Sequence, residues 1–121
     1  MHEVSVAESL AALIRRHLQT HQHLVGATVR IGPMHGVVPE ALQSAWSVVS
    51  AAEGWNDAQL HVVTPPWRLR CIACGRRWTP TTIDEPCECG SSHADIVGGD
   101  EFLLESIEVE TEPMCPASRR I

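Results

Sequence analysis

Apolar residues recur at helical spacing in two segments of the first half of the chain. In the first segment, one helix face holds five positions: Leu10, Leu13, Ile14, His17 and Leu18. Ser5 followed three residues later by Glu8 forms a capping box, because each side chain can bond an amide of the first turn. This pattern predicts a helix over residues 5–20. A second apolar stripe predicts a helix that begins at Pro39, where a missing amide costs nothing, and ends just before Gly54.

Three other segments have the pattern of strands. Residues 25–31 alternate with a period of two, which predicts a strand with one buried face. Its buried side is predicted to hold four residues: Val25, Ala27, Val29 and Ile31. Residues 59–64 predict a second strand, and a crossover through the second helix would make these two strands parallel or nearly adjacent. Residues 101–109 predict a third strand with apolar residues on both sides, which indicates a central strand or one covered on two faces.

The chain is acidic, and its charge is unevenly spread. It holds nine cationic side chains, all of them Arg, and fifteen acidic ones, for a net charge of −6, and residues 99–112 hold six acids and no cation. Nucleic acids and anionic membrane surfaces bind clustered cations, so neither is an expected partner. No apolar run approaches the roughly 20 residues that span a bilayer, and the start has no secretory signal. We therefore expect a cytoplasmic protein, in which cysteines serve first as metal ligands.

Four of the five cysteines form two close pairs: Cys71 with Cys74, and Cys87 with Cys89. Two such pairs separated by a polar loop are typical of a tetrahedral Zn(Cys)₄ site, and a glycine after each pair suits the tight turn around the ion. Four thiolates leave no open position, so the predicted zinc is structural. The segment around them has few large apolar side chains, and zinc would supply on the order of 10 kcal/mol toward ordering it.

Two alternatives stay open at this site. The second pair is one residue shorter than usual, which makes His93 the reserve candidate for the fourth ligand. A thiol–disulfide motif at Cys71 and Cys74 is disfavoured, because the residues from Gly75 onward do not begin a helix.

Together these features predict an α+β fold with two helices on a small three-stranded sheet and a four-cysteine zinc subdomain inserted between the second and third strands. Residues 1–66 and 99–112 are expected to form the α+β domain, and residues 67–98 the zinc-binding subdomain. Residues 113–121 are expected to be a flexible tail in which Cys115 is a free thiol.

Several short sequences occur in an order that is similar to a known family. They are Met1-His2-Glu3-Val4-Ser5, Ile31-Gly32, Gly36-Val37-Val38-Pro39-Glu40-Ala41-Leu42, the paired cysteines, and Glu105-Ser106-Ile107-Glu108-Val109. Over residues 1–110 the chain resembles the HypA/HybF family of hydrogenase-maturation nickel chaperones. It departs from that family in the shortened second cysteine pair and in the proline-rich tail with Cys115.

The resemblance implies a Ni(II) site at Met1, His2 and Glu3, and the chemistry of these residues agrees with it. A free α-amine, the amide nitrogen of residue 2 and its imidazole can chelate one cation in adjacent rings, a nitrogen set that suits tetragonal Ni(II) or Cu(II). Glu3 would contribute either its backbone nitrogen or its carboxylate. The alternative is that residues 1–4 only lead into a helix and that His2 is solvated.

The function that the resemblance implies is delivery of Ni(II) to the large subunit of a [NiFe]-hydrogenase, together with a GTPase partner of the same maturation pathway. No nucleophile with a base and no phosphate loop is recognisable, so we expect no catalysis. Two other functions stay open: a zinc-ribbon interaction module without transferable metal, and nickel delivery to urease.

Two further features have a functional and a bland interpretation. The first is a group of histidines, His17, His21 and His23, which would form a second metal site if the first helix continued, or else lie at the helix end, where they suit its dipole. The second is the acidic run from Asp100 to Glu112, which is either a solvated face or a contact for a basic partner.

Overall fold

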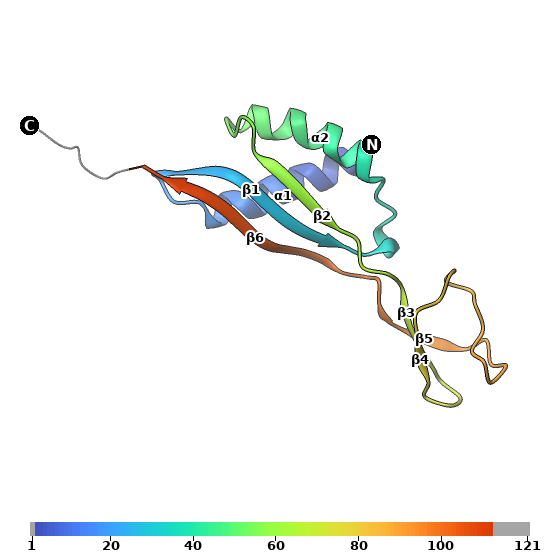
Figure 1. The fold of residues 1–121 in the computed structure, drawn as a ribbon. Coiled ribbons are helices and arrows are strands. Elements are labelled where there is room, and N and C mark those ends of the chain that lie inside the picture. Colours follow the sequence, from blue (N-terminus) through green and yellow to red (C-terminus); the bar gives the residue numbers. More distant parts are fainter. Residues whose placement is uncertain (1, 113–121) are drawn as a thin grey trace, which may run out of the picture. The chain divides into compact units, whose positions relative to one another are not determined.

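The computed structural model describes residues 2–112 and has two helices and two small sheets (Figure 1). The helical elements are α1 His2–His17, the short 3-10 helix η1 Pro33–His35 and α2 Pro39–Ala52. The strands are β1 Gln22–Ile31, β2 Gln59–Val63, β3 Arg68–Cys71, β4 Arg77–Trp78, β5 Ala94–Gly98 and β6 Phe102–Thr111. Strand order is β2-β1-β6 in one sheet and β4-β3-β5 in the other. The predicted α+β class, with two helices and a three-stranded sheet interrupted by a cysteine-rich insertion, is confirmed.

Helix α1 begins three residues earlier than the capping box predicts. It starts at His2, so Ser5 lies inside the helix and its predicted role as N-cap is wrong. A long-range contact accounts for the earlier start, because the Glu3 carboxylate in the first turn accepts a hydrogen bond from the amide of Val38 at 3.1 Å. The helix buries one apolar face, formed by Ala7, Leu10, Ala11 and Ile14. His17, which the pattern placed on that face, is exposed.

Helix α2 has the boundaries that its proline and glycine predict. Pro39 is the first helical residue after Val38, whose extended backbone forms the N-cap. The chain leaves the helix at Gly54, where φ is +83° and a side chain would be strained. Trp46, buried on the inner side of the helix, donates from Nε1 to the carbonyl of Ala58 at 3.0 Å and so ties α2 to the loop before β2.

Strand β1 is the middle strand of its sheet. In Figure 1, β1 and β2 run in the same direction and β6 runs in the opposite one, as the crossover through α2 requires. Both neighbours approach closely at Gly26, where a Cβ atom would lie 2.5 Å from Glu108 Oε1 on β6 and 3.4 Å from the carbonyl of Gln59 on β2. A side chain at this position would therefore have to displace the Glu108 carboxylate, the end of a flexible side chain, while its contact with β2 would be an ordinary one.

In β1, the observed burial follows the predicted alternation only in the second half of the strand. Ala27, Val29 and Ile31 are buried as predicted, but Val25 is 40% exposed and Leu24 is buried instead. The prediction is wrong at Val25 because the alternation shifts by one position next to Gly26.

Strand β6 is an edge strand among the described residues, so of the two predicted alternatives, a central strand or one covered on two faces, the central one is wrong. It pairs with β1 alone, and none of its residues is buried. Leu103 is 52% exposed, and the ring of Phe102 meets His35 edge-on with centroids 5.5 Å apart. Its apolar residues on two sides reflect partial cover rather than a second neighbouring strand.

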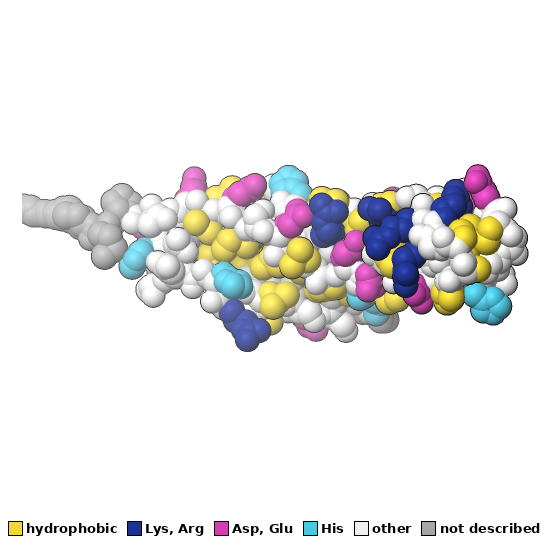
Figure 2. Space-filling view, turned by 90° about the horizontal axis from the view of Figure 1, so that it is seen from below, with side chains coloured by type: hydrophobic (Ala, Val, Ile, Leu, Met, Phe, Trp, Pro, Cys, Tyr) yellow, Lys and Arg dark blue, Asp and Glu magenta, His cyan; other side chains and the backbone are white. Residues whose placement is uncertain are grey.

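The second sheet is short and antiparallel. Across it, Leu69 on β3 lies opposite Trp78 on β4, and Arg70 lies opposite Arg77. Arg70 also lies opposite Asp95 on β5, and their side chains form an ion pair at 2.7 Å. Successive residues of a strand point to opposite faces, so one face of this sheet is apolar and the other carries arginines. In Figure 2, dark blue side chains gather over this part of the chain.

Among the described residues, the chain divides into two compact units. The first contains residues 2–29, 37–61 and 104–112, and the second contains residues 30–36 and 62–103. Within the second unit, backbone bonds hold η1 to the segment before β6, because the Gly32 amide donates to Glu101 O at 2.8 Å and the Met34 amide to Gly99 O at 2.9 Å. No helix among residues 2–112 is long and apolar enough to cross a membrane.

Candidate metal centres

The four paired cysteines converge in the second unit. Their Sγ atoms all lie within 4.8 Å of one another. The closest contacts join the two pairs: Cys71 Sγ lies 3.6 Å from Cys89 Sγ, and Cys74 Sγ lies 3.6 Å from Cys87 Sγ. In residues 2–112 this is the one group of three or more side chains of metal-ligating type that are close enough to share an ion.

Two similar turns bring the sulfurs together. In the first cysteine turn, the amide of Gly75 donates to the carbonyl of Cys71 at 2.9 Å, and in the second, the amide of Gly90 donates to the carbonyl of Cys87 at 2.8 Å. Both glycines have positive φ, +80° and +94°. The second turn is one residue shorter but closes in the same way, so Cys89 reaches the cluster. His93 is exposed and is not part of it.

The pKa is lowered at two of the four sulfurs. The backbone amide of Cys74 donates to the Cys71 sulfur, which lowers the pKa of Cys71 to about 6 despite burial. The backbone amide of Cys89 likewise lowers the pKa of Cys87. Both residues are buried, and with Leu69 they form part of a small core.

The other two sulfurs favour the protonated form. The amide of Arg76 favours the thiolate of Cys74, but the adjacent sulfur and burial outweigh it and raise the pKa of Cys74 to about 11. At Cys89 the amide of Ser91 is similarly outweighed, and the pKa is raised. Each 3.6 Å contact thus joins a sulfur whose pKa is lowered to one whose pKa is raised, and a bound dication would displace the protons that remain on the cluster.

The cluster fits a zinc ion by distance and by chemistry. A tetrahedral site with Zn–S bonds of about 2.3 Å separates its sulfurs by about 3.8 Å, close to the 3.6 Å of the two contacts. Because all four donors are thiols, such a site is closed and suits a structural role.

The predicted amino-terminal residues lie partly outside the described residues. Met1 is not among them, and neither are Cys115 and the rest of the predicted tail, 113–121. The His2 side chain is about half exposed, and its Nδ1 lies 3.7 Å from Glu3 Oε2. The pKa of Glu3 is lowered, chiefly by the hydrogen bond from the Val38 amide.

The remaining histidines do not form a second helical metal site. Helix α1 ends at His17, so His21 does not follow it at one helical turn. His23 lies on β1, where its Nε2 is 3.2 Å from Glu112 Oε2. His35 instead places its Nε2 3.0 Å from the carbonyl of Asp100.

Two contacts at these sites are not predicted from the sequence. One is the bond from the Val38 amide to Glu3, and the other is the approach of the Arg76 guanidinium to Cys87, with Nη1 3.8 Å from Sγ. Each joins residues that are far apart along the chain or separated by a loop, so no local spacing could reveal it.

Fold and site together define a small α+β protein with a four-cysteine cluster that could hold a metal ion. A family model described as "Hydrogenase/urease nickel incorporation, metallochaperone, hypA" matches residues 1–109. The chain belongs to this HypA family of metallochaperones.

The sequences of individual relatives align with this chain over nearly their whole length. The hydrogenase maturation factor HypA of Wolinella succinogenes is 33% identical over 116 residues, covering 93% of this chain and 98% of that protein. The same factor of Solidesulfovibrio magneticus is 38% identical over 117 residues, covering 91% and 100%. The solution structure of the Ni metallochaperone HypA from Helicobacter pylori matches with a TM-score of 0.63 and 30% identity, covering 91% of this chain and 98% of that one.

Proposed function

We propose that this protein is a nickel metallochaperone that binds Ni(II) at Met1, His2 and Glu3 and delivers it to the large subunit of a [NiFe]-hydrogenase. A structural Zn(II) at Cys71, Cys74, Cys87 and Cys89 would order the second unit. Membership of the HypA family is the single observation that carries the proposal. The family description couples nickel incorporation to hydrogenase or urease, and the chain holds residues at its start that suit nickel.

The start of α1 supports the nickel ligand set. Because the helix begins at His2, the amides of His2 and Glu3 lie in the first turn, whose N–H groups the helical ladder does not use. A metal that replaces the proton of an amide there breaks no bond of the helix. The imidazole of His2 is exposed enough to take up a cation and to release it to a partner.

Nickel ligation by Glu3 is better supported through its backbone nitrogen than through its carboxylate. Its carboxylate already accepts the amide of Val38 at 3.1 Å, so ligation through that carboxylate would compete with the bond between the starts of α1 and α2. Ligation through the amide nitrogen leaves this bond in place. We therefore assign the α-amine, the His2 amide and imidazole, and the Glu3 amide to the nickel plane.

Calorimetric titration of zinc-loaded protein tests the nickel site. The wild type should bind one Ni(II), whereas His2→Ala, or one residue added before Met1, should lose that binding and keep zinc. His61→Ala, which removes an exposed histidine from β2, is the matched control and should still bind nickel. Wild-type affinity in both amino-terminal variants would exclude the proposed ligands and leave a zinc-folded interaction module.

A transfer assay tests delivery. Nickel-loaded protein mixed with the apo large subunit of a hydrogenase, the pathway's GTPase and GTP should raise the nickel content of the large subunit, and His2→Ala should not. Apo-urease in place of the large subunit tests the other recipient that the family description names. Transfer to urease alone would contradict hydrogenase as the recipient. Cell fractionation should find the protein in the cytoplasm with these partners.

A further inference from the structure

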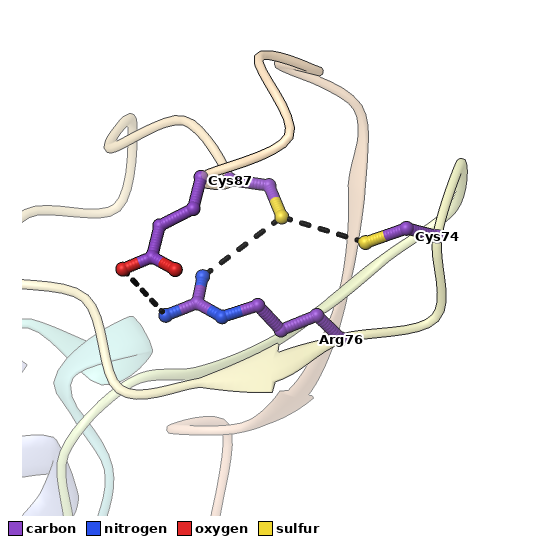
Figure 3. A network of polar contacts seen from close by, with 4 residues as sticks. Cys74, Arg76 and Cys87 are labelled. Carbon is purple, nitrogen blue, oxygen red and sulfur yellow. Dashed lines mark hydrogen bonds and ion pairs between the residues drawn. The ribbon is translucent and has the colours of Figure 1, made fainter.

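One cationic side chain contacts the cysteine cluster. From its position next to the first cysteine turn, Arg76 reaches across to the second, where Nη1 lies 3.8 Å from Cys87 Sγ (Figure 3). Cys87 is 3% exposed, so the guanidinium lies beside a sulfur that water barely reaches.

An aromatic ring, rather than an ion pair, holds Arg76 in place. Its guanidinium carbon lies 5.2 Å from the centroid of the Trp78 ring, within the range of a cation–π contact. Its second nitrogen lies 3.7 Å from Glu88 Oε2, but Glu88 is 83% exposed. Exposed ion pairs contribute little, so Trp78 is the main support of the guanidinium.

A positive group at this position matters because of the charge of a loaded site. Four thiolates around Zn(II) carry a net charge of −2, and hydrogen bonds to a ligating sulfur draw density from it and make it a poorer nucleophile. An arginine stays charged at any pH at which the protein folds. Its planar guanidinium can also stack on Trp78 and donate to sulfur at the same time, which a lysine ammonium cannot do.

We propose that Arg76 is a positioning residue of the zinc site that holds the Cys87 thiolate on the metal and slows zinc loss. This inference rests on the proposed zinc at the four cysteines. It divides the ligands into two kinds. Cys87 and Cys71 are buried and would stay bound to the metal, whereas Cys74 and Cys89 are exposed and would dissociate from it first.

The rate of zinc transfer from loaded protein to a chromogenic chelator tests the proposal. Arg76→Gln, which removes the charge but keeps a donor, should release zinc about 10-fold faster, the lower end of the effect of losing an outer partner of a metal ligand. Arg76→Lys should be intermediate. Arg77→Gln is the matched control, since the adjacent Arg77 is exposed and lies on the sheet face opposite Trp78. A wild-type rate in Arg76→Gln would overturn the proposal.

Glu88→Gln separates a charge effect from mere anchoring. If Arg76 acts through its charge, removal of the nearby carboxylate should leave zinc release unchanged or slower. If Glu88 is needed to anchor the side chain, release should be faster, which would contradict the proposal. This variant also keeps the test valid if Arg76→Gln fails to fold.

Alkylation with N-ethylmaleimide, read by mass spectrometry, gives a second readout. In this reaction a thiolate sulfur adds across the maleimide double bond, and the neighbouring carbon takes a proton from water. Of the four cysteines in the cluster, Cys74 and Cys89 should be modified first in the wild type, and in Arg76→Gln, Cys87 should join them. Cys87 reacting first in the wild type would refute the assignment. Failure of the zinc proposal itself would be distinct, because elemental analysis would then find no zinc in the wild type.

Discussion

The two units of the chain are stabilised in different ways. The first buries a continuous set of apolar side chains: Ala7, Leu10, Ala11, Ile14, Leu24, Ala27, Val29, Leu42, Ala45, Trp46, Ala58 and Leu60. The core around the cysteines of the second unit holds only four buried residues: Leu69, Cys71, Trp78 and Cys87. Two of these are themselves candidate metal ligands.

That small core is also imperfect. Among the described residues, the indole nitrogen of Trp78 is buried without a hydrogen-bond partner, which costs about 1–3 kcal/mol. The first unit can fold through the hydrophobic effect, whereas in the second the zinc proposed above would do what a larger core does. One short chain would thus combine two means of stabilisation, a hydrophobic core and a metal site. Each can be tested separately.

Zinc removal should have the largest effect and should be confined to the second unit. A chelator removes a contribution on the order of 10 kcal/mol, so amide resonances from residues 62–103 should lose dispersion while the helical circular dichroism of the first unit persists. Cys71→Ser should have the same effect without a chelator. Cys115→Ser is the control and should lose structure only with the chelator. Dispersed resonances from the second unit in protein shown to lack zinc would break the comparison.

A core truncation in the first unit should have the opposite selectivity. Leu10 is fully buried, so Leu10→Ala should reduce the free energy of unfolding of the first unit by about 2–5 kcal/mol in urea. The zinc content should stay at one per chain. Val48→Ala is the matched control, because Val48 is 71% exposed, and should change little. Equal losses in the two variants would argue against an apolar core as the main stabilising element.

The bond between Glu3 and Val38 should give a smaller, pH-dependent effect. Folding lowers the pKa of Glu3, so its carboxylate stabilises the fold at pH values above its ordinary pKa, and this contribution is lost as the pH falls through the folded-state pKa. Glu3→Gln should therefore be less stable than the wild type at neutral pH, and the gap should close in acid. Urea titrations over a pH series measure it. Glu8→Gln, on the same helix, is the control for loss of an acidic side chain from α1.

The smallest effect is expected at the ion pair between Arg70 and Asp95. Both side chains are about half exposed, so Asp95→Asn should change the stability of the zinc-loaded second unit by less than about 1 kcal/mol. Thermal melts of the two proteins give the difference. A larger loss would mean that polar contacts across β3 and β5, and not only the sulfurs, hold this unit together.

The sequence predicts local features of the fold well, because apolar spacing reports which face of an element is buried. It predicts two of the four buried residues of α1, Leu10 and Ile14, and the proline start of α2, all of which depend on neighbours along the chain, and the cysteine spacing predicts that the two pairs converge. It does not predict that α1 begins at His2, since that start depends on a bond between Glu3 and Val38, 35 residues apart.

Strand order and the surroundings of the cluster are also beyond local patterns. The sequence pattern of β6 would be the same in an edge strand as in a central one. Only the strand order shows that β6 has one neighbouring strand, β1, among the described residues. In the sequence, Arg76 is an ordinary turn residue next to Gly75. Its contact with Cys87 exists only because the fold brings the loop that carries Cys87 close to it. The nickel residues come from family resemblance, and their assignment stays a prediction.

The outer rim of β6 leaves a row of backbone groups without a strand beside it among the described residues. Such rims invite the addition of another molecule's strand and the growth of fibrils. Strand β6 carries three acidic side chains, Glu105, Glu108 and Glu110, and charged side chains on an edge strand oppose its pairing with another copy of the chain.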